Sequence, residues 1–176
     1  MMAAAIFSFS WILSAGEKLD IKGSFGSKLK SGLPEGWLPN KPGFWDNEAT
    51  ITLNKIPDTE KNALQVTSQT KAIQIWFSKK WTISAGDKCI IKAMVKGKGR
   101  VGLGLYYYPY ECGISKAFNP WKEFQATEEW TEYSVEILIP EGSPGISEIA
   151  VAIMVKPGAS IEFADVAAEI EKKQQK

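Results

Sequence analysis

The sequence predicts an all-β protein that folds as an antiparallel two-sheet β-sandwich. Short segments in which apolar and polar residues alternate recur along the chain, and this period of two is typical of half-buried strands. Turn-forming residues separate the segments, as in "IPEGSPG" at 139–145 and "KPGA" at 156–159. No convincing helical pattern lies between the segments, which favours two packed antiparallel sheets.

The alternating segments define the strands that we expect. They lie at 18–25, 49–53, 63–67, 72–77, 88–96, 101–108, 132–139, 148–155 and 160–170. The glycine-rich "KGKG" at 96–99 predicts a hairpin turn between two of them. The end of the chain, "DVAAEIEKKQQK", is compatible with a short helical turn but is better read as the end of a strand.

The period of two also divides the side chains between two faces. One set is almost wholly apolar and is expected to form the core: Cys89, Ile91, Ala93, Val95, Val101, Leu103, Leu105, Tyr133, Val135, Ile137, Ile139, Ile149, Val151, Ile153, Val155, Ile161 and Phe163, with Ile73, Ile75 and Phe77. The other set mixes small, aromatic and charged residues and is expected to form one shared face: Ile90, Lys92, Met94, Lys96, Gly102, Gly104, Tyr106, Tyr108, Ser134, Glu136, Leu138, Ala150, Ala152 and Met154, with Gln74 and Trp76.

Length and charge limit the possible functions. A chain of 176 residues is long enough for one self-sufficient domain. Its formal net charge of +1 gives no electrostatic footprint for nucleic acid. The absence of histidine excludes Ser-His and Cys-His nucleophile pairs as well as histidine metal sites.

The first residues, "MMAAAIFSFSWILSAG", predict a signal peptide over 1–16. The apolar run is of signal-peptide length, is too short to span a bilayer and ends in small residues, although no Lys or Arg precedes it. A cloning remnant or a first strand is the alternative. The prediction is a secreted or periplasmic protein with a β-sandwich domain at 17–171, a charged tail at 172–176 and no membrane span.

Cys89 and Cys112 are the two cysteines of the chain. In an exported protein they could form a disulfide. Two separate buried thiols fit the sequence equally well, because spacing alone does not test the geometry of a bridge. Without histidine, the pair makes a poor zinc site.

The order of several segments resembles carbohydrate-binding modules of the family 4/9/22 type. The stretches that carry the resemblance are "IKGSF" at 21–25, "GLPEGW" at 32–37, "ISAGDKCIIKAMVKG" at 83–97, "ATEEWTEYSVEILIP" at 126–140 and "IEFADVAAEI" at 161–170. The resemblance implies a jelly-roll sandwich of the galactose-binding-like class that binds polysaccharide or oligosaccharide. The expected fold class is therefore an antiparallel two-sheet jelly-roll β-sandwich.

Such modules commonly hold a structural calcium ion, and this chain departs from their pattern. The opening motif offers Ser24 in place of an acid, and Asp165 is the one acid that matches the closing pair, because its neighbour is Ala164. Calcium requires about six to eight oxygen ligands. Asp165 is therefore a weak candidate ligand, and we expect no cofactor.

The stretch "GRVGLGLYYYPYE" at 99–111 predicts the binding site. Sugars present C–H faces and hydroxyl edges, so they are bound by aromatic rings and planar polar groups. Trp76, Tyr106 and Tyr108 are the expected stacking residues, and Gln74, Lys92 and Glu136 the expected hydrogen-bonding residues. Gly102 and Gly104 would leave room for a sugar ring to lie flat. Alternatively, loops cover this face and the aromatic residues fill the gap.

Other aromatic residues have less certain roles. Trp45 is expected in a loop at the rim of the site, or as a plug at one end of the sandwich. Tyr110 and Trp121 fall in a long segment that is either a binding loop or an irregular edge strand. Trp37, Trp81 and Trp130 match structural positions of the resemblance, which implies that they lie in the core.

These observations together favour a secreted, non-catalytic protein that binds carbohydrate through the concave face of the β-sandwich. The main alternative is a structural or protein-interaction β-sandwich whose mixed face packs against another protein chain. A glycoside hydrolase would need a second carboxyl group near Glu136, since hydrolysis uses two carboxyls at a defined separation.

Overall fold

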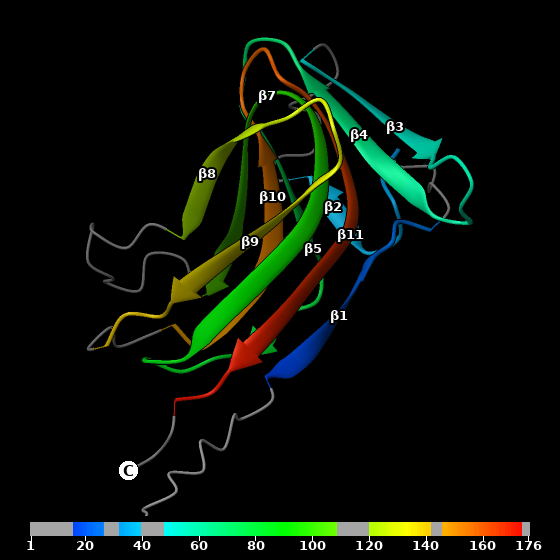
Figure 1. The fold of residues 1–176 in the computed structure, drawn as a ribbon. Helices are drawn as coiled ribbons and strands as arrows, with labels where there is room; N and C mark the ends of the chain where they lie inside the picture. The colour runs from blue at the N-terminus through cyan, green and yellow to red at the C-terminus, as the bar shows by residue number, and fades with distance from the viewer. Residues whose placement is uncertain (1–15, 27–31, 40–47, 109–119, 142–145, 174–176) are drawn as a thin grey trace, which may run out of the picture.

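The computed structural model describes residues 16–26, 32–39, 48–108, 120–141 and 146–173, and these residues contain strands and no helix (Figure 1). The strands are β1 (Glu17–Gly23), β2 (Trp37–Pro39), β3 (Ala49–Lys55), β4 (Asn62–Ser68), β5 (Ile73–Phe77), β6 (Trp81–Thr82), β7 (Lys88–Tyr108), β8 (Trp121–Ala126), β9 (Thr131–Leu138), β10 (Glu148–Val155) and β11 (Ser160–Glu171). All pairings are antiparallel, which confirms the predicted all-β fold class.

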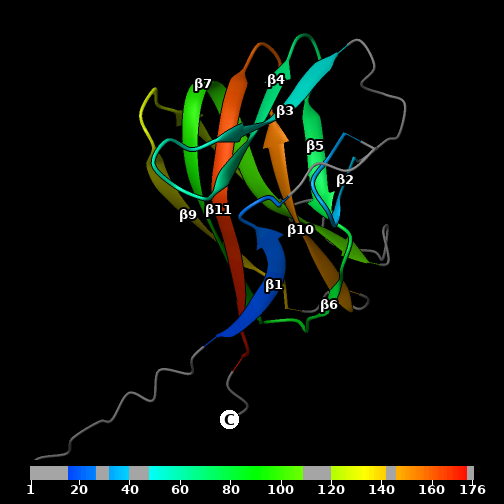
Figure 2. The ribbon, with the colours of Figure 1, turned by 90° about the vertical axis from the view of Figure 1, so that its right-hand side faces the viewer.

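The strands form two facing layers, and both Figures 1 and 2 show them. The β11 sheet has the order β9-β7-β11-β4-β3, with β1 paired to β11 beyond the end of β4. The β10 sheet has the order β8-β7-β10-β5-β2, with β6 paired to the start of β10. In Figure 2, β11 and β4 lie on one side and β10, β5 and β2 on the other.

Strand β7 belongs to both sheets, and the predicted hairpin turn at 96–99 is wrong. Residues up to Lys98 pair with β11, whereas residues from Gly99 onward pair with β8 and then β10. The chain bends without reversing at Gly97 and Gly99, whose φ angles are +144° and +110°. Glycine favours a bend as readily as a turn, because it adopts positive φ at little cost.

The core between the sheets consists of the residues that the period of two selects. Every member of the predicted core set is buried except Tyr133, which is half-buried and packs against the core. The alternation along β11 changes phase at a bulge between Ala164 and Ala167, so that Val166, Ala168 and Ile170 point inward after it. The core therefore remains apolar along the whole of β11.

The predictions for the core tryptophans and for the cysteines can be compared with the structure. Trp37 and Trp81 are buried, as predicted, but Trp130 is half-exposed and lies outside the core. Cys89 is a fully buried free thiol, and burial raises its pKa to about 12, with a further contribution from Glu169. Cys112 lies outside the described residues, so the disulfide between Cys89 and Cys112 stays a prediction.

The carboxylate of Asp87 ties the end of β11 to the start of β7. It is buried, and it accepts hydrogen bonds from the backbone N–H groups of Ser84 (2.9 Å) and Lys173 (2.8 Å) and from Lys172 Nζ (3.2 Å). Burial acts to raise the pKa of Asp87, but these hydrogen bonds and the Lys172 charge outweigh it, so the pKa lies below its usual value.

We expect Asp87→Asn to destabilise the protein at pH 7 by about 1–3 kcal/mol, because an amide places a donor where two backbone donors converge. A lowered pKa means that the stabilisation is present above the unfolded-state value of about 4 and is lost as the pH falls below it. Urea unfolding at pH 7 and pH 3 should therefore show a smaller loss on acidification in the variant. An equal loss in both proteins would contradict this role.

Candidate functional site

The β10 sheet brings four of the seven predicted site residues together on its outer face. Gln74 and Trp76 lie on β5, and Tyr106 and Tyr108 lie on β7, all directed away from the core. Trp45 lies outside the described residues. Lys92 and Glu136 do not belong to this group.

Lys92 and Glu136 lie on the outer face of the other sheet, so the prediction of one shared face is wrong. Lys92 precedes the bend of β7 and pairs with β9 and β11, and Glu136 lies on β9. Because β7 crosses between the sheets, its outward residues before and after the bend face opposite sides of the sandwich. The alternation of apolar and polar residues shows whether a side chain points inward or outward. It does not show to which of the two sheets that part of the strand belongs.

Small residues form the floor of the β10 outer face. Ala152 pairs with Gly104 on one side and Trp76 on the other, and Ala150 pairs with Tyr106. A Cβ atom on Gly104 would lie 2.4 Å from the ring of Trp121. The glycine does leave room for a flat ring, as expected, but the ring is an indole of the same chain. Trp121 begins the edge strand β8, which was one of the two predicted alternatives for its segment.

The aromatic side chains form a connected cluster of half-exposed rings above this floor. The ring of Tyr106 lies 6.0 Å from that of Trp76 and 6.1 Å from that of Trp121, centroid to centroid. The ring of Tyr108 lies 6.4 Å from that of Trp76. The first two pairs meet edge to face, the geometry that aromatic quadrupoles prefer. We call Trp76, Tyr106, Tyr108 and Trp121 the aromatic cluster.

Gln74 supplies a planar amide beside the aromatic cluster. The hydroxyl of Tyr106 donates a hydrogen bond to Gln74 Oε1, and Gln74 Nε2 lies 3.6 Å from the sulfur of Met154. These contacts fix the orientation of the amide next to half-exposed rings. The predicted combination of stacking and hydrogen-bonding groups is therefore present, but with Gln74 as the one polar partner from the predicted set.

Charged residues flank the cluster at both ends, and sequence reasoning missed them. At one end, Lys80 Nζ lies 3.6 Å from the ring centroid of Tyr108 and 3.9 Å from Glu148. Burial and the Glu148 charge raise the pKa of Tyr108, so its phenol is neutral at physiological pH. At the other end, Glu123 accepts from Arg100 and Lys156, both at 3.0 Å. No local pattern marks these pairs, because their members come from different strands.

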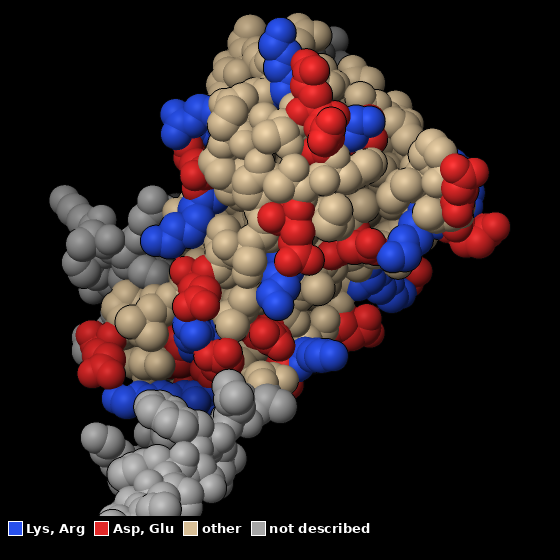
Figure 3. Space-filling model, viewed as in Figure 1, with Lys and Arg blue, Asp and Glu red and all other residues tan. Residues whose placement is uncertain are grey.

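The outer face of the β11 sheet has a different character. Figure 3 shows positive and negative side chains interspersed over it, without a patch of one sign. Glu136 accepts a hydrogen bond from Lys88 at 3.2 Å, and Lys88 also pairs with Glu171 at 2.8 Å. Glu136 is thus an ion-paired surface residue that faces away from the aromatic cluster.

Asp165, the weak calcium candidate, forms an ion pair with Lys61 at 2.8 Å. It lies at the bulge of β11, with a φ of +47°. Within the described part of the chain, no three acidic, Cys or His side chains gather in a group that could hold a metal ion. Nor do the described residues include a helix long and apolar enough to cross a membrane.

The sequence matches no known protein family and no curated protein, but the fold matches solved structures. The Stig cyclase Fisc from Fischerella sp. TAU aligns with 13% identity and a TM-score of 0.63, over 91% of this chain and 100% of the cyclase. The CBM22-1 xylan-binding domain of Paenibacillus barcinonensis Xyn10C aligns with 14% identity and a TM-score of 0.55, over 91% and 98%. An arabinose-bound α-L-arabinofuranosidase, MgGH51, aligns with 18% identity and a TM-score of 0.58, over 88% of this chain and 26% of that protein.

These likenesses establish the jelly-roll β-sandwich fold. The neighbours include a xylan-binding domain as well as cyclases, so the fold alone does not select between ligand binding and catalysis. The side chains on the two outer faces, rather than the fold, distinguish between these functions.

Proposed function

We propose that this protein binds carbohydrate non-covalently through the outer face of the β10 sheet. The observation that carries the proposal is the half-exposed aromatic cluster with the amide of Gln74 beside it. Aromatic rings stack on the C–H faces of sugars, and a planar amide both donates to and accepts from hydroxyls. Trp76 and Tyr108 are proposed as stacking residues, and Tyr106 and Gln74 as a linked polar pair.

The charged ends of this face favour binding over hydrolysis. Glu148 and Glu123 each pair with cations, and they lie at opposite ends of the cluster. General acid–base cleavage needs two carboxyls on either side of one bond, one of them protonated. Because both carboxylates are ion-paired at opposite ends of the cluster, we propose a non-catalytic role, in a protein that is secreted or periplasmic.

The xylan-binding domain supports this proposal because it has a similar fold and binds a polysaccharide. The Stig cyclases, one of them bound to an indole-containing molecule, show that the same fold accommodates other ligands. A small aromatic compound in place of a sugar is therefore a useful comparison ligand in the experiment below.

Replacing Trp76 by alanine should weaken glycan binding by about tenfold or more. The loss combines ring stacking, about 0.5–1.5 kcal/mol, with the apolar area that a sugar would cover. The experiment is a glycan-panel screen of a chain that begins at Glu17, followed by calorimetric titration of the positive glycans. Tyr108→Ala should also weaken binding, whereas Trp130→Ala, a change of the same size outside the cluster, should not.

Two outcomes would contradict the proposal. If Lys92→Ala or Glu136→Ala weakens the binding of a neutral glycan while Trp76→Ala does not, the site for neutral sugars lies on the β11 sheet. If no glycan binds to a folded wild-type chain, the aromatic cluster is not a sugar site. Self-association or capture of an aromatic compound at Trp76 would then indicate the alternative of a protein or small-molecule interface.

A further inference from the structure

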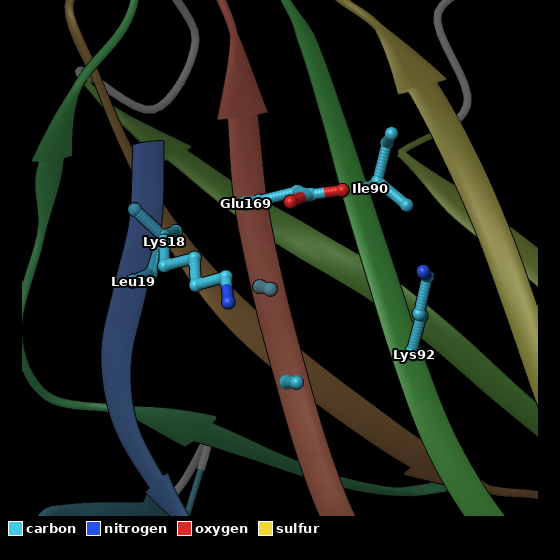
Figure 4. A pocket seen from close by; sticks show the side chains of 7 residues that line it. Lys18, Leu19, Ile90, Lys92 and Glu169 are labelled. Atoms are coloured by element: carbon cyan, nitrogen blue, oxygen red, sulfur yellow. The ribbon is translucent and has the colours of Figure 1, made fainter. Parts of the chain in front are cut away.

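A second candidate site lies on the outer face of the β11 sheet, where β1, β11 and β7 meet. It is a hollow of about 260 Å³ lined by Lys18, Leu19, Ile90, Lys92, Ala167, Ala168 and Glu169. Figure 4 shows Lys18 on β1 and Lys92 on β7, on either side of β11. Ala167 pairs with Lys92 in register and follows the bulge of β11, so a small side chain leaves the space between the two lysines open.

Two lysines that border the hollow have no ion-pair partner among the described residues. Lys61 and Lys88, also on this side of the sandwich, pair with Asp165 and Glu136. Among the described residues, neither Lys18 nor Lys92 forms an ion pair, although Lys18 lies directly across from Glu169 in register. The Glu169 side chain is directed toward Ile90 instead (Figure 4). Two ammonium groups and one carboxylate thus border an apolar floor without neutralising one another.

This combination specifies the chemistry of a ligand. Two lysines attract an anionic group, and their flexible stems let both ammoniums reach one carboxylate or sulfate. Glu169 accepts hydrogen bonds from hydroxyl groups. Ile90 and Ala167 offer apolar surface for C–H groups. A volume of about 260 Å³ is just below the range of typical small-molecule sites, about 300–1,000 Å³, and fits a compact ligand.

We infer that this hollow binds one anionic sugar residue, a uronic acid or a sulfated sugar, with its anion between Lys18 and Lys92 and its hydroxyls on Glu169. The site is separate from the aromatic cluster, because it belongs to the other sheet and faces the opposite side of the sandwich. It does not depend on the proposed function of the β10 sheet. The chain would then have two ligand faces, one selected by stacking and one by charge.

The test is a titration of the ¹⁵N-labelled full chain with methyl galacturonoside, sulfated galactose and neutral methyl galactoside. The anionic sugars should shift the amide signals of Lys92 and Ala167, and the neutral sugar should not. Raising the salt from 50 to 500 mM should weaken binding, since exposed charges are screened. The response to the two anions distinguishes a carboxylate-selective site from a general anion site.

Two kinds of variant separate charge from shape. Lys18→Gln and Lys92→Gln should each weaken binding by about threefold, and the double variant by about tenfold. Ala167→Leu fills the hollow and keeps both charges, so it should abolish binding. Lys98→Gln removes the same charge from β7 outside the hollow and should have no effect beyond the change in net charge.

The inference is overturned if Ala167→Leu binds the uronate as the wild type does, or if Lys98→Gln weakens binding as much as Lys92→Gln. It is also overturned if the neutral sugar shifts the same signals equally. Trp76→Ala should leave uronate binding unchanged. Failure of the β10 face and failure of this hollow are therefore distinguishable in the same set of proteins.

Discussion

Replacing Gly97 by alanine should destabilise the fold by at least about 3 kcal/mol. Gly97 lies where β7 passes from the β11 sheet to the β10 sheet, with a φ of +144° that side-chain-bearing residues rarely adopt. A Cβ atom there would lie 2.2 Å from the carbonyl oxygen of Ser160. Backbone strain of about 1–3 kcal/mol and overpacking of a similar size both contribute, because the contact is with backbone and cannot rotate away.

The same substitution should also weaken ligand binding on the β10 face. Tyr106 and Tyr108 follow the bend on the same strand, so a displaced bend shifts both rings relative to Trp76. Binding should therefore decrease even in the fraction of protein that remains folded.

Gly158→Ala is the matched control for this prediction. Gly158 also has a positive φ, +74°, but no atom lies within 4 Å of the position that its Cβ would take. Gly158→Ala should therefore destabilise the protein only by the cost of placing alanine at a positive φ, about 1–2 kcal/mol. Urea unfolding of both variants, followed by circular dichroism, measures the difference. If the two substitutions cost the same, the bend at Gly97 is not tightly held against β11.

The inward faces of the strands could be predicted because they depend only on local alternation. Val101, Leu103 and Leu105 are buried, and so are Ile149, Val151 and Ile153 on β10, as the period of two requires. The sequence alone therefore predicted the fold class and most of the core.

The outward faces could not be assigned to a common surface in the same way. The glycines at 97 and 99 fit a hairpin and a bend equally, and the choice depends on how closely Ala159 and Ser160 approach them. Those residues come from a distant part of the chain. For this reason the prediction that Lys92 and Glu136 share a face with Trp76 was wrong. Tyr106 follows the bend and lies in the same sheet as Trp76, so the prediction that these two residues share a face is confirmed.

The packing of Trp121 against Gly104 could not be predicted from the sequence either. It depends on β8 pairing with β7, and the sequence left open whether the segment that contains Trp121 is a binding loop or an edge strand. The prediction that Trp130 lies in the core was wrong, because it followed only from a matching position in the resemblance. In this chain the residue lies between β8 and β9, outside the core.

Trp37→Ala should destabilise the protein by about 3–5 kcal/mol. Trp37 is 1% exposed, and its ring lies 5.4 Å from that of Phe25 and 5.5 Å from that of Phe77, centroid to centroid. Phe77 in turn stacks on Trp81 at 6.0 Å. Removing the central ring leaves a cavity among rigid aromatic neighbours that cannot collapse fully. Since domains are stable by about 5–15 kcal/mol, the variant should be marginal.

Trp37→Phe tests whether volume or the indole nitrogen dominates at this position. Trp37 Nε1 is buried and has no hydrogen-bond partner among the described residues, and an unsatisfied buried donor costs about 1–3 kcal/mol. Phenylalanine removes that cost while keeping one aromatic ring, so it should destabilise by less than half as much as alanine.

Trp130→Ala, at a half-exposed site, is the control and should cost less than about 1 kcal/mol. Circular dichroism is the appropriate probe in urea unfolding, because each substitution removes a fluorophore. The contrary outcome is that Trp37→Ala destabilises the protein no more than Trp130→Ala. The segment from Leu33 to Trp37 would then not belong to the cooperative core. The end of the sandwich that contains Phe25 and Phe77 would unfold separately from the rest.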